Sequence, residues 1–236
     1  MYIDFIPMFI KSWNKLYPEV DVKVILINDS VPEKFEEYKD NIICFPALEG
    51  ISTAFISQYI RLLYPALLTE YENGIVISDI DIIPMNKHYF TKNIEDLDTN
   101  RFISYRNFLA GNQIAMCYNV ATASTWSEVF SINSIEDIVN NIKTTYSKIS
   151  YNASKLKGWF TDQQYLYSSV TGWSEYKERF VCLKDRNTGF RRLDRGTFNM
   201  KEKLITFIKS GIFSDYHCYR PYEKYKKIND KIVQLL

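Results

Sequence analysis

One short segment constrains the fold of this chain more than any other: GIVISDIDIIPMN, at residues 74–86. An apolar run leads to two acids, Asp79 and Asp81, and a second apolar step then ends at Pro84. Residues i and i+2 of a strand point to the same face, so the spacing predicts that the two carboxylates lie side by side. Adjacent carboxylates repel, and an unpaired buried charge is costly. The segment therefore indicates either a divalent cation such as Mg²⁺ or Mn²⁺, which prefers oxygen ligands, or a strand end that emerges into water.

The pattern around this segment alternates helices with apolar strands through the first 120 residues. Apolar residues at helical spacing predict a helix over 2–17, and a long helix is predicted over 52–70. Further helices are expected at 124–130, 135–148, 161–170 (with Thr161 as the N-cap) and after Pro221. Strands are expected at 22–29, 74–86, 114–121 and 180–185, the first of them buried on both faces. This order favours one α/β domain with a mainly parallel central sheet flanked by helices.

Composition narrows the classes of function. The chain has 236 residues and a net charge of +1, which argues against a nucleic-acid binder, because phosphate neutralisation needs an excess of Lys and Arg. No apolar run approaches the length needed to span a bilayer. Four cysteines without a CxxC pair favour reduced thiols over a zinc site or a disulfide framework. We therefore expect a protein without a transmembrane segment, kept in a cytoplasm.

Only two histidines are present. His88 follows the acidic segment in a polar loop and is interpreted as a surface residue. His217 lies in DYHCYRPYEKY together with Arg220 and Lys224, which would combine one imidazole for a metal with two cations for phosphate. The alternative is a structural histidine.

These segments, in this order, resemble nucleotide-sugar glycosyltransferases of the GT-A fold over most of the chain. The resemblance is carried by VKVILINDS, SQYIRLLYPALL, GIVISDIDIIP, WFTDQQYLY and DYHCYRPYEKY. Within that family, the chain is similar to the small glycosyltransferases encoded by large DNA viruses such as chlorella viruses. For a viral protein, the expected location would be the cytoplasm of the host cell.

The resemblance implies a single GT-A (Rossmann-like) domain over residues 1–236. Residues 1–120 would form the nucleotide-binding half, and residues 121–236 the acceptor half with a C-terminal metal and phosphate segment. In that family a first strand precedes the helix that here begins at Tyr2, so the first strand is expected to be absent. That expectation keeps open the alternative of a catalytically inactive sugar- or nucleotide-binding module.

The resemblance also implies roles for individual residues. Mn²⁺ or Mg²⁺ would be held by Asp79, Asp81 and His217. Nucleotide contacts would come from the residues Asp29, Arg61, Asp79, Arg220 and Lys224. Asp162 and Gln163 would face the sugar and the reaction centre, although Asp162 is also a favourable helix-start acid. Sugar or acceptor contacts would come from Trp159, Asn187, Arg191 and Arg192; a core role for Trp159, and a solvated turn for the other three, stay open.

The expected reaction is the metal-dependent transfer of a sugar, of the hexosyl or deoxyhexosyl class, from a UDP-sugar to a glycan or glycoprotein acceptor. The His-and-Lys tail leans toward retention of configuration. The sequence has no GxxxxGK[ST] loop and no GxSxG elbow, which argues against nucleoside triphosphate chemistry and against a serine hydrolase.

Overall fold

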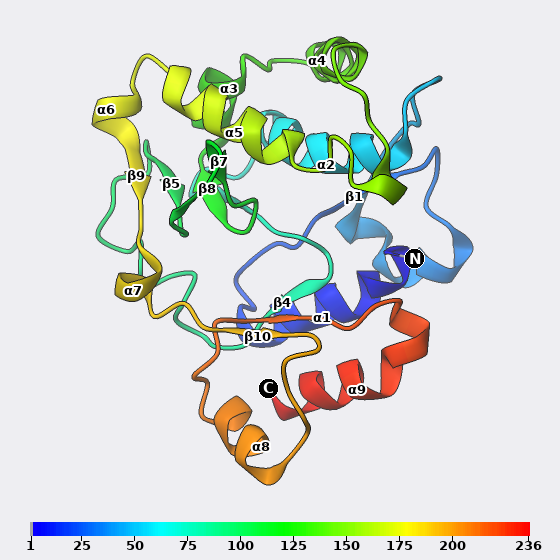
Figure 1. Ribbon diagram of the computed structural model, residues 1–236, viewed down its shortest axis with the longest axis vertical. Coiled ribbons are helices and arrows are strands. Elements are labelled where there is room, and N and C mark those ends of the chain that lie inside the picture. The colour runs from blue at the N-terminus through cyan, green and yellow to red at the C-terminus, as the bar shows by residue number, and fades with distance from the viewer. Residues whose placement is uncertain (1) are drawn as a thin grey trace.

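The apolar segments of the chain pair into four small sheets. The computed structural model describes residues 2–236 (Figure 1). A four-stranded sheet has the order β3-β8-β5-β9, and a three-stranded sheet has the order β10-β11-β4. The parallel pair β1-β2 and the hairpin β6-β7 complete the strands. Figure 1 shows α2, α3, α4 and α5 in the upper part of the molecule, with α1, α8 and α9 in the lower part.

The elements have the following bounds. The α-helices are α1 (Ile6–Leu16), α2 (Thr53–Leu63), α3 (Ala123–Phe130), α4 (Ile135–Ser147), α5 (Thr161–Gly172), α6 (Tyr176–Arg179), α7 (Asp185–Thr188), α8 (Glu202–Lys209) and α9 (Tyr222–Leu235). The strands are β1 (Val24–Ile27), β2 (Ile42–Phe45), β3 (Ile75–Ile77), β4 (Ile82–Pro84), β5 (Phe102–Ser104), β6 (Phe108–Leu109), β7 (Gln113–Ile114), β8 (Asn119–Ala121), β9 (Phe180–Cys182), β10 (Arg192–Asp194) and β11 (Asp215–His217). Short 3₁₀ segments are η1 (Ile3–Phe5), η2 (Glu33–Asn41), η3 (Tyr64–Leu67) and η4 (Ala153–Lys155).

Two hydrophobic cores lie on either side of the acidic segment. One core packs α1 and α9 against β4 and β11 and includes Trp13, Ile83 and Tyr216. The other packs α2, α3, α4 and α5 together and includes Phe55 and Trp126. The segment from β3 to β4 passes from the second core to the first, because Ile77 belongs to one and Ile82 to the other.

The mixed α/β class is confirmed, but the prediction of one mainly parallel central sheet was wrong. Three of the strand pairs are parallel and four are antiparallel, in separate small sheets. The physical reason is that two predicted strands are interrupted. Residues 74–86 divide into β3 and β4, and residues 114–121 into β7 and β8, with each part pairing in a different sheet.

The predicted helices are confirmed, with small shifts at their ends. The predicted helix over 52–70 ends as an α-helix at Leu63 and continues as the η3 turn, because Pro65 lacks an amide hydrogen. Thr161 is the first residue of α5 instead of its N-cap, and its hydroxyl donates to the Gly158 carbonyl at 2.5 Å. Strand β1 is less buried than predicted, since only Val24 of its four residues is buried. None of the helices within residues 2–236 combines the length and apolar character needed to cross a membrane.

Candidate functional site at the junction of two sheets

Asp79 and Asp81 lie in the turn that joins β3 to β4. The Ile82 amide donates a hydrogen bond to the Asp79 carbonyl, at 3.0 Å from N to O, so the backbone turns here instead of staying extended. The prediction that both carboxylates project from one strand face was therefore wrong. The turn lies where the chain passes between the four-stranded and the three-stranded sheet, and each carboxylate has its own set of partners.

The Asp79 carboxylate is paired with Arg61 of α2. The Arg61 Nη1 donates to Asp79 Oδ1, and its Nη2 donates to Asp162 Oδ2 at 2.6 Å. Asp162, in the first turn of α5, is only 1% exposed, and its Oδ1 accepts the Gln163 amide at 2.8 Å. A carboxylate this deeply buried needs a paired cation. Arg61 therefore links the turn to α5 and compensates the charge of Asp162.

The second Asp79 oxygen contacts a buried thiol. Cys117 Sγ lies 3.0 Å from Asp79 Oδ2, and the Asp79 amide donates to the same sulfur at 3.3 Å. Burial raises the pKa of Cys117 to about 12, so the thiol keeps its proton and donates a hydrogen bond to the carboxylate. Asp79 is thus held from both sides, by a guanidinium and by a thiol.

The Asp81 carboxylate has a different environment. Arg195 Nη1 donates to Asp81 Oδ2 at 2.9 Å, His217 Nε2 lies 3.5 Å from the same oxygen, and Arg220 Nη1 lies 3.7 Å from it. The side chain of Asp81 is buried, which opposes its ionisation. Hydrogen bonds and positive charge from His217 and Arg195 outweigh that burial and lower the pKa of Asp81 below its ordinary value.

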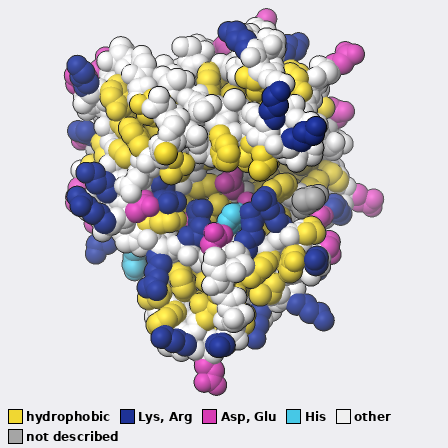
Figure 2. Space-filling model, in the orientation of Figure 1, with side chains coloured by type: hydrophobic (Ala, Val, Ile, Leu, Met, Phe, Trp, Pro, Cys, Tyr) yellow, Lys and Arg dark blue, Asp and Glu magenta, His cyan; other side chains and the backbone are white. Residues whose placement is uncertain are grey.

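Strand pairing brings His217 to this position. His217 and Asp194 are register partners in the parallel pair β11-β10, and β11 also pairs antiparallel with β4, where His217 lies opposite Ile82. The His217 Nδ1 is 2.7 Å from Asp194 Oδ1, which orients the ring so that Nε2 faces Asp81. In Figure 2, acidic, basic and histidine side chains gather in the middle of the face, between the two parts of the molecule.

Part of this donor set suits a divalent cation. Asp81 and His217 face each other, and Asp194 binds the far ring nitrogen, as outer carboxylates do for metal-binding histidines. Asp79, the third predicted ligand, is held by Arg61 and Cys117. Within residues 2–236, no three His, Cys, Asp or Glu side chains form a group that could hold a metal by themselves. The arrangement fits a cation that takes further ligands from bound phosphates, as Mg²⁺ commonly does.

The structure gathers some of the remaining predicted residues and leaves others apart. Gln163 follows Asp162, and its buried Oε1 has no hydrogen-bond partner in residues 2–236. Trp159 is half-buried, and its carbonyl accepts Gln58 Nε2 at 3.0 Å. Across the described chain, no hydrogen bond or ion pair connects the following exposed residues to the acidic turn: Asp29, Asn187, Arg191 and Lys224.

Arg192 is not available as an acceptor contact. Its Nε and Nη2 bind Asp215 at 2.8 and 2.7 Å, and Asp215 is fully buried. The bidentate pair raises the pKa of Arg192 despite its burial. Its role in the structure is to hold β10 to β11.

Three residues of the site were not singled out from the sequence: Cys117, Asp194 and Arg195. The last two belong to RRLDR at 191–195, which reads as a short basic cluster or a turn. The alternation of polar and apolar residues around Leu193, which is 3% exposed, is the signal that indicates a strand there. No local sequence pattern links that strand to Asp81. The two come together because β11 pairs with β10 on one side and with β4, which follows Asp81, on the other.

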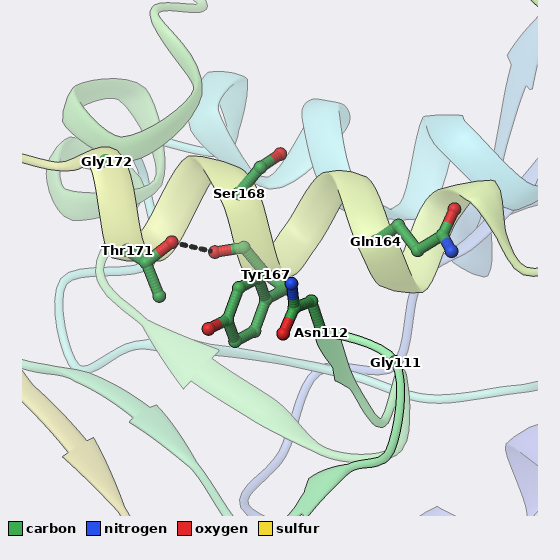
Figure 3. A pocket seen from close by; sticks show the side chains of 7 residues that line it. All are labelled: Gly111, Asn112, Gln164, Tyr167, Ser168, Thr171 and Gly172. Carbon is green, nitrogen blue, oxygen red and sulfur yellow. Dashed lines mark hydrogen bonds between the residues drawn. The ribbon is translucent and has the colours of Figure 1, made fainter.

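An open polar pocket lies along α5, the helix that carries Asp162. Figure 3 shows its lining residues on α5 and at the turn of the β6-β7 hairpin. Its volume is about 460 Å³. Its lining contains no charged side chain and one aromatic ring: Gly111, Asn112, Gln164, Tyr167, Ser168, Thr171 and Gly172. Amides, hydroxyls and one aromatic face suit an uncharged polar ligand better than a phosphate.

Comparisons with known proteins give a structural likeness only. No family model matches the chain, and no curated protein matches its sequence. The crystal structure of the glycosyltransferase GlyE from Streptococcus pneumoniae TIGR4 is similar, with a TM-score of 0.50 and 16% identity. The likeness covers 99% of this chain and 60% of that one, so the chain spans less than two thirds of the GlyE structure. The apo form of GlyE gives a TM-score of 0.48 and 16% identity over 99% of this chain and 59% of that one. The chain thus shares the fold of a glycosyltransferase; nothing in these comparisons supports a viral origin.

Proposed function

We propose that this protein is a glycosyltransferase that moves a sugar from a nucleoside-diphosphate sugar to the hydroxyl group of a glycan or glycoprotein acceptor. The observation that carries the proposal is the convergence of Arg195, Arg220 and His217 on the buried carboxylate of Asp81, within a fold similar to that of a glycosyltransferase. The resemblance of its sequence to GT-A enzymes favours UDP as the nucleotide.

The two arginines beside Asp81 are the proposed diphosphate ligands. Arg220 is 38% exposed and only loosely paired with Asp81, so it can turn toward an incoming phosphate. Arg195 donates through one nitrogen, Nη1, to Asp81 and to the Cys218 carbonyl, which leaves its other guanidinium donors for a phosphate oxygen. As the bond from the sugar C1 to the diphosphate breaks, its electron pair goes to the diphosphate, and these cations stabilise the added charge.

Asp81 and His217 are the proposed metal ligands, with Asp194 holding the imidazole in place. When bound, a Mn²⁺ or Mg²⁺ ion supplies positive charge to the departing diphosphate. Asp79 would join this set only by exchanging its contact with Arg61 for the metal.

Asp162 is proposed as a positioning residue for the donor sugar. Both its oxygens accept hydrogen bonds, one from Arg61 and one from the backbone N–H of Gln163. Because Asp162 is also buried, it is poorly placed to take the proton of the acceptor hydroxyl as a general base. The neighbouring Gln163 has a buried side-chain oxygen, Oε1, without a hydrogen-bond partner among the described residues. In this proposal that oxygen accepts a hydrogen bond from a hydroxyl of the donor sugar. The acceptor oxygen then bonds to C1 and its proton leaves to the departing phosphate or to solvent.

The pocket along α5 is the proposed place for the acceptor sugar. Its amide and hydroxyl groups can bind sugar hydroxyls, and the Tyr167 ring offers a face for the apolar side of a pyranose (Figure 3). The exposed residues Asn187 and Arg191 stay as more distant acceptor contacts in this proposal.

Thermal stability measured with UDP, GDP and their sugars, with and without Mn²⁺, tests the proposal. We expect one nucleotide to raise the melting temperature, and Mn²⁺ to increase that rise. Asp81→Asn should abolish the effect of Mn²⁺, whereas Asp98→Asn, at an exposed pair with Arg101, should preserve it. An equal rise in Asp81→Asn would contradict the assignment of the metal ligands.

Turnover separates an enzyme from a binding module. Release of UDP from UDP-sugars in the presence of Mn²⁺ is expected for an enzyme. Nucleotide binding without release from any donor would instead support a glycosyltransferase-like fold that binds but does not catalyse.

A further inference from the structure

The loop from α4 to α5, residues 148–160, exposes two large hydrophobic side chains to solvent. Leu156 is 59% exposed and Phe160 is 49% exposed, the highest values for large hydrophobic residues within residues 2–236. Leu156 lies six residues and Phe160 two residues before the buried Asp162 of the candidate site. Single exposed hydrophobics are common, but two in one loop call for a reason.

The loop is built in a defined way around Leu156. Asn152 and Lys157 exchange backbone hydrogen bonds at 2.9 and 3.0 Å, and the Asn152 side chain accepts the Lys155 amide at 3.1 Å. The turn places Leu156 in the left-handed region, with φ of 54°, which bulky residues rarely adopt. A glycine or asparagine would suit that backbone better. Because Leu156 is 59% exposed, packing within the described chain does not explain the leucine either.

The base of the loop is attached to the helix that carries Arg61. Gln58 of α2 donates to the Trp159 carbonyl at 3.0 Å and accepts the Tyr151 hydroxyl at 2.9 Å. The carbonyl of the same Gln58 accepts Arg61 Nε at 3.2 Å. The exposed tip is therefore fixed relative to the acidic turn.

The charge along this stretch of the chain is of one sign. Residues 138–161 contain no acid and four lysines: Lys143, Lys148, Lys155 and Lys157. All four are exposed, and within residues 2–236 none forms an ion pair. Lys155 and Lys157 flank Leu156 directly.

We propose that the α4–α5 loop binds the surface of an anionic membrane, with Leu156 and Phe160 inserted among the lipids and the lysines against the headgroup phosphates. Apolar residues flanked by Lys suit the boundary between headgroups and acyl chains, since long lysine stems reach the phosphates while their neighbours insert. A nucleic acid would not use the exposed Leu156, and a second copy of this chain would gain nothing from four like charges meeting at the contact. The inference goes beyond the proposed function, and holds whether or not the protein transfers sugar.

Vesicle co-sedimentation tests this binding. The probes are phosphatidylcholine vesicles with and without phosphatidylserine. We expect the protein to sediment with the anionic vesicles only, and to be released as the salt concentration rises. Each lysine near the surface is expected to change the partition coefficient by roughly fivefold, so Lys155→Ser with Lys157→Ser should lower it by about 25-fold.

Exposed positions allow matched variants that keep the fold. Leu156→Ser with Phe160→Ser should abolish co-sedimentation, whereas Ile135→Ser, at a 44% exposed hydrophobic residue at the start of α4, should leave it unchanged. Unchanged melting temperatures would show that each variant is folded. Equal sedimentation of the Leu156/Phe160 variant and the unaltered chain, or no preference for anionic vesicles, would overturn the proposal. The proposal would also be overturned if the unaltered chain did not bind vesicles but self-associated, and if the Leu156/Phe160 double variant abolished that self-association.

Discussion

The two acids of the turn, only two residues apart, lie in opposite electrostatic settings. Asp79 shares Arg61 with the buried Asp162, so two carboxylates compete for one guanidinium, and a neutral thiol completes the set. Asp81 has two arginines and an imidazole around one carboxylate. The first group is closed in the sense that its charged side chains pair with one another, and it carries a net negative charge. The second contains partly exposed cations in excess of its buried acid.

This difference assigns separate tasks to the two groups. The Asp79 group joins α2, α5 and the turn, and its internal pairing leaves no cation for a ligand. The Asp81 group is carried by the three-stranded sheet and its following residues, and it offers donors that a phosphate could use. We therefore expect changes in the first group to act mainly on stability, and changes in the second to act mainly on binding.

The largest expected effect is on the Asp79 group. Arg61→Ala would leave Asp162 buried and unpaired, and we expect it to lower the free energy of unfolding by about 3–5 kcal/mol. Chemical denaturation measures this. Arg101→Ala, which breaks the exposed pair with Asp98, is the control and should cost less than about 1 kcal/mol.

A double variant sharpens this prediction. In Arg61→Ala with Asp162→Asn, the unpaired buried charge is gone, so much of the lost stability should return. If Arg61→Ala alone costs no more than Arg101→Ala, Arg61 does not compensate the buried charge of Asp162.

The next effect concerns nucleotide binding by the Asp81 group. Arg195→Gln and Arg220→Gln each remove a proposed phosphate ligand, and we expect the dissociation constant of UDP to rise about 10- to 100-fold. Titration calorimetry measures it. Lys224→Gln is the matched control, because Lys224 is exposed and pairs with no residue of the turn within residues 2–236.

The contrast between Arg220 and Lys224 also separates two interpretations of the C-terminal segment. The sequence predicts both as phosphate ligands, whereas the structure directs only Arg220 toward Asp81. A larger loss with Lys224→Gln than with Arg220→Gln would reverse the assignment made from the geometry.

A smaller effect is expected from pH. The folded protein holds the pKa of Asp81 below its ordinary value, so the unfolded chain binds the proton more readily. Stability from this group is therefore fully present above the unfolded pKa of about 3.9, and is lost as the pH falls through the lower, folded value. Denaturation curves of the unaltered chain and Asp81→Asn should differ most near neutral pH and converge in acid. Curves that diverge in acid would contradict the lowered pKa of Asp81 in the folded protein.

How much of this could be predicted from the sequence depends on the range of each contact. Helices such as α1 and α4 follow from apolar residues at helical spacing along a few turns. The acidic pair and His217 were found because their residue types indicate chemistry. The direction of strand pairing was not predicted correctly, because strands of two to four residues are too short for a pattern that distinguishes parallel from antiparallel pairing.

Non-local pairing explains the residues that sequence reasoning missed. Arg195 reaches Asp81 only because β11 pairs with β4 on one side and with β10 on the other. Each of these contacts joins residues more than twenty positions apart, and no periodic signal encodes them. Asp162 was expected near the sugar, but its engagement by Arg61 depends on the packing of α2 against α5, which the sequence pattern does not specify.

The smallest expected effect returns to the Asp79 group. Cys117→Ala removes the thiol that donates to Asp79, while Cys117→Ser replaces it by a hydroxyl that can also donate. Because the Asp79 side chain is 35% exposed, water can take the place of the lost donor, and the alanine variant should be less stable than the serine variant by only about 0.5–1 kcal/mol. Chemical denaturation of the pair measures this difference. UDP affinity should be the same in both variants, since the thiol serves the closed group; a change in affinity that equals that of Arg195→Gln would show that the two acids act as one site.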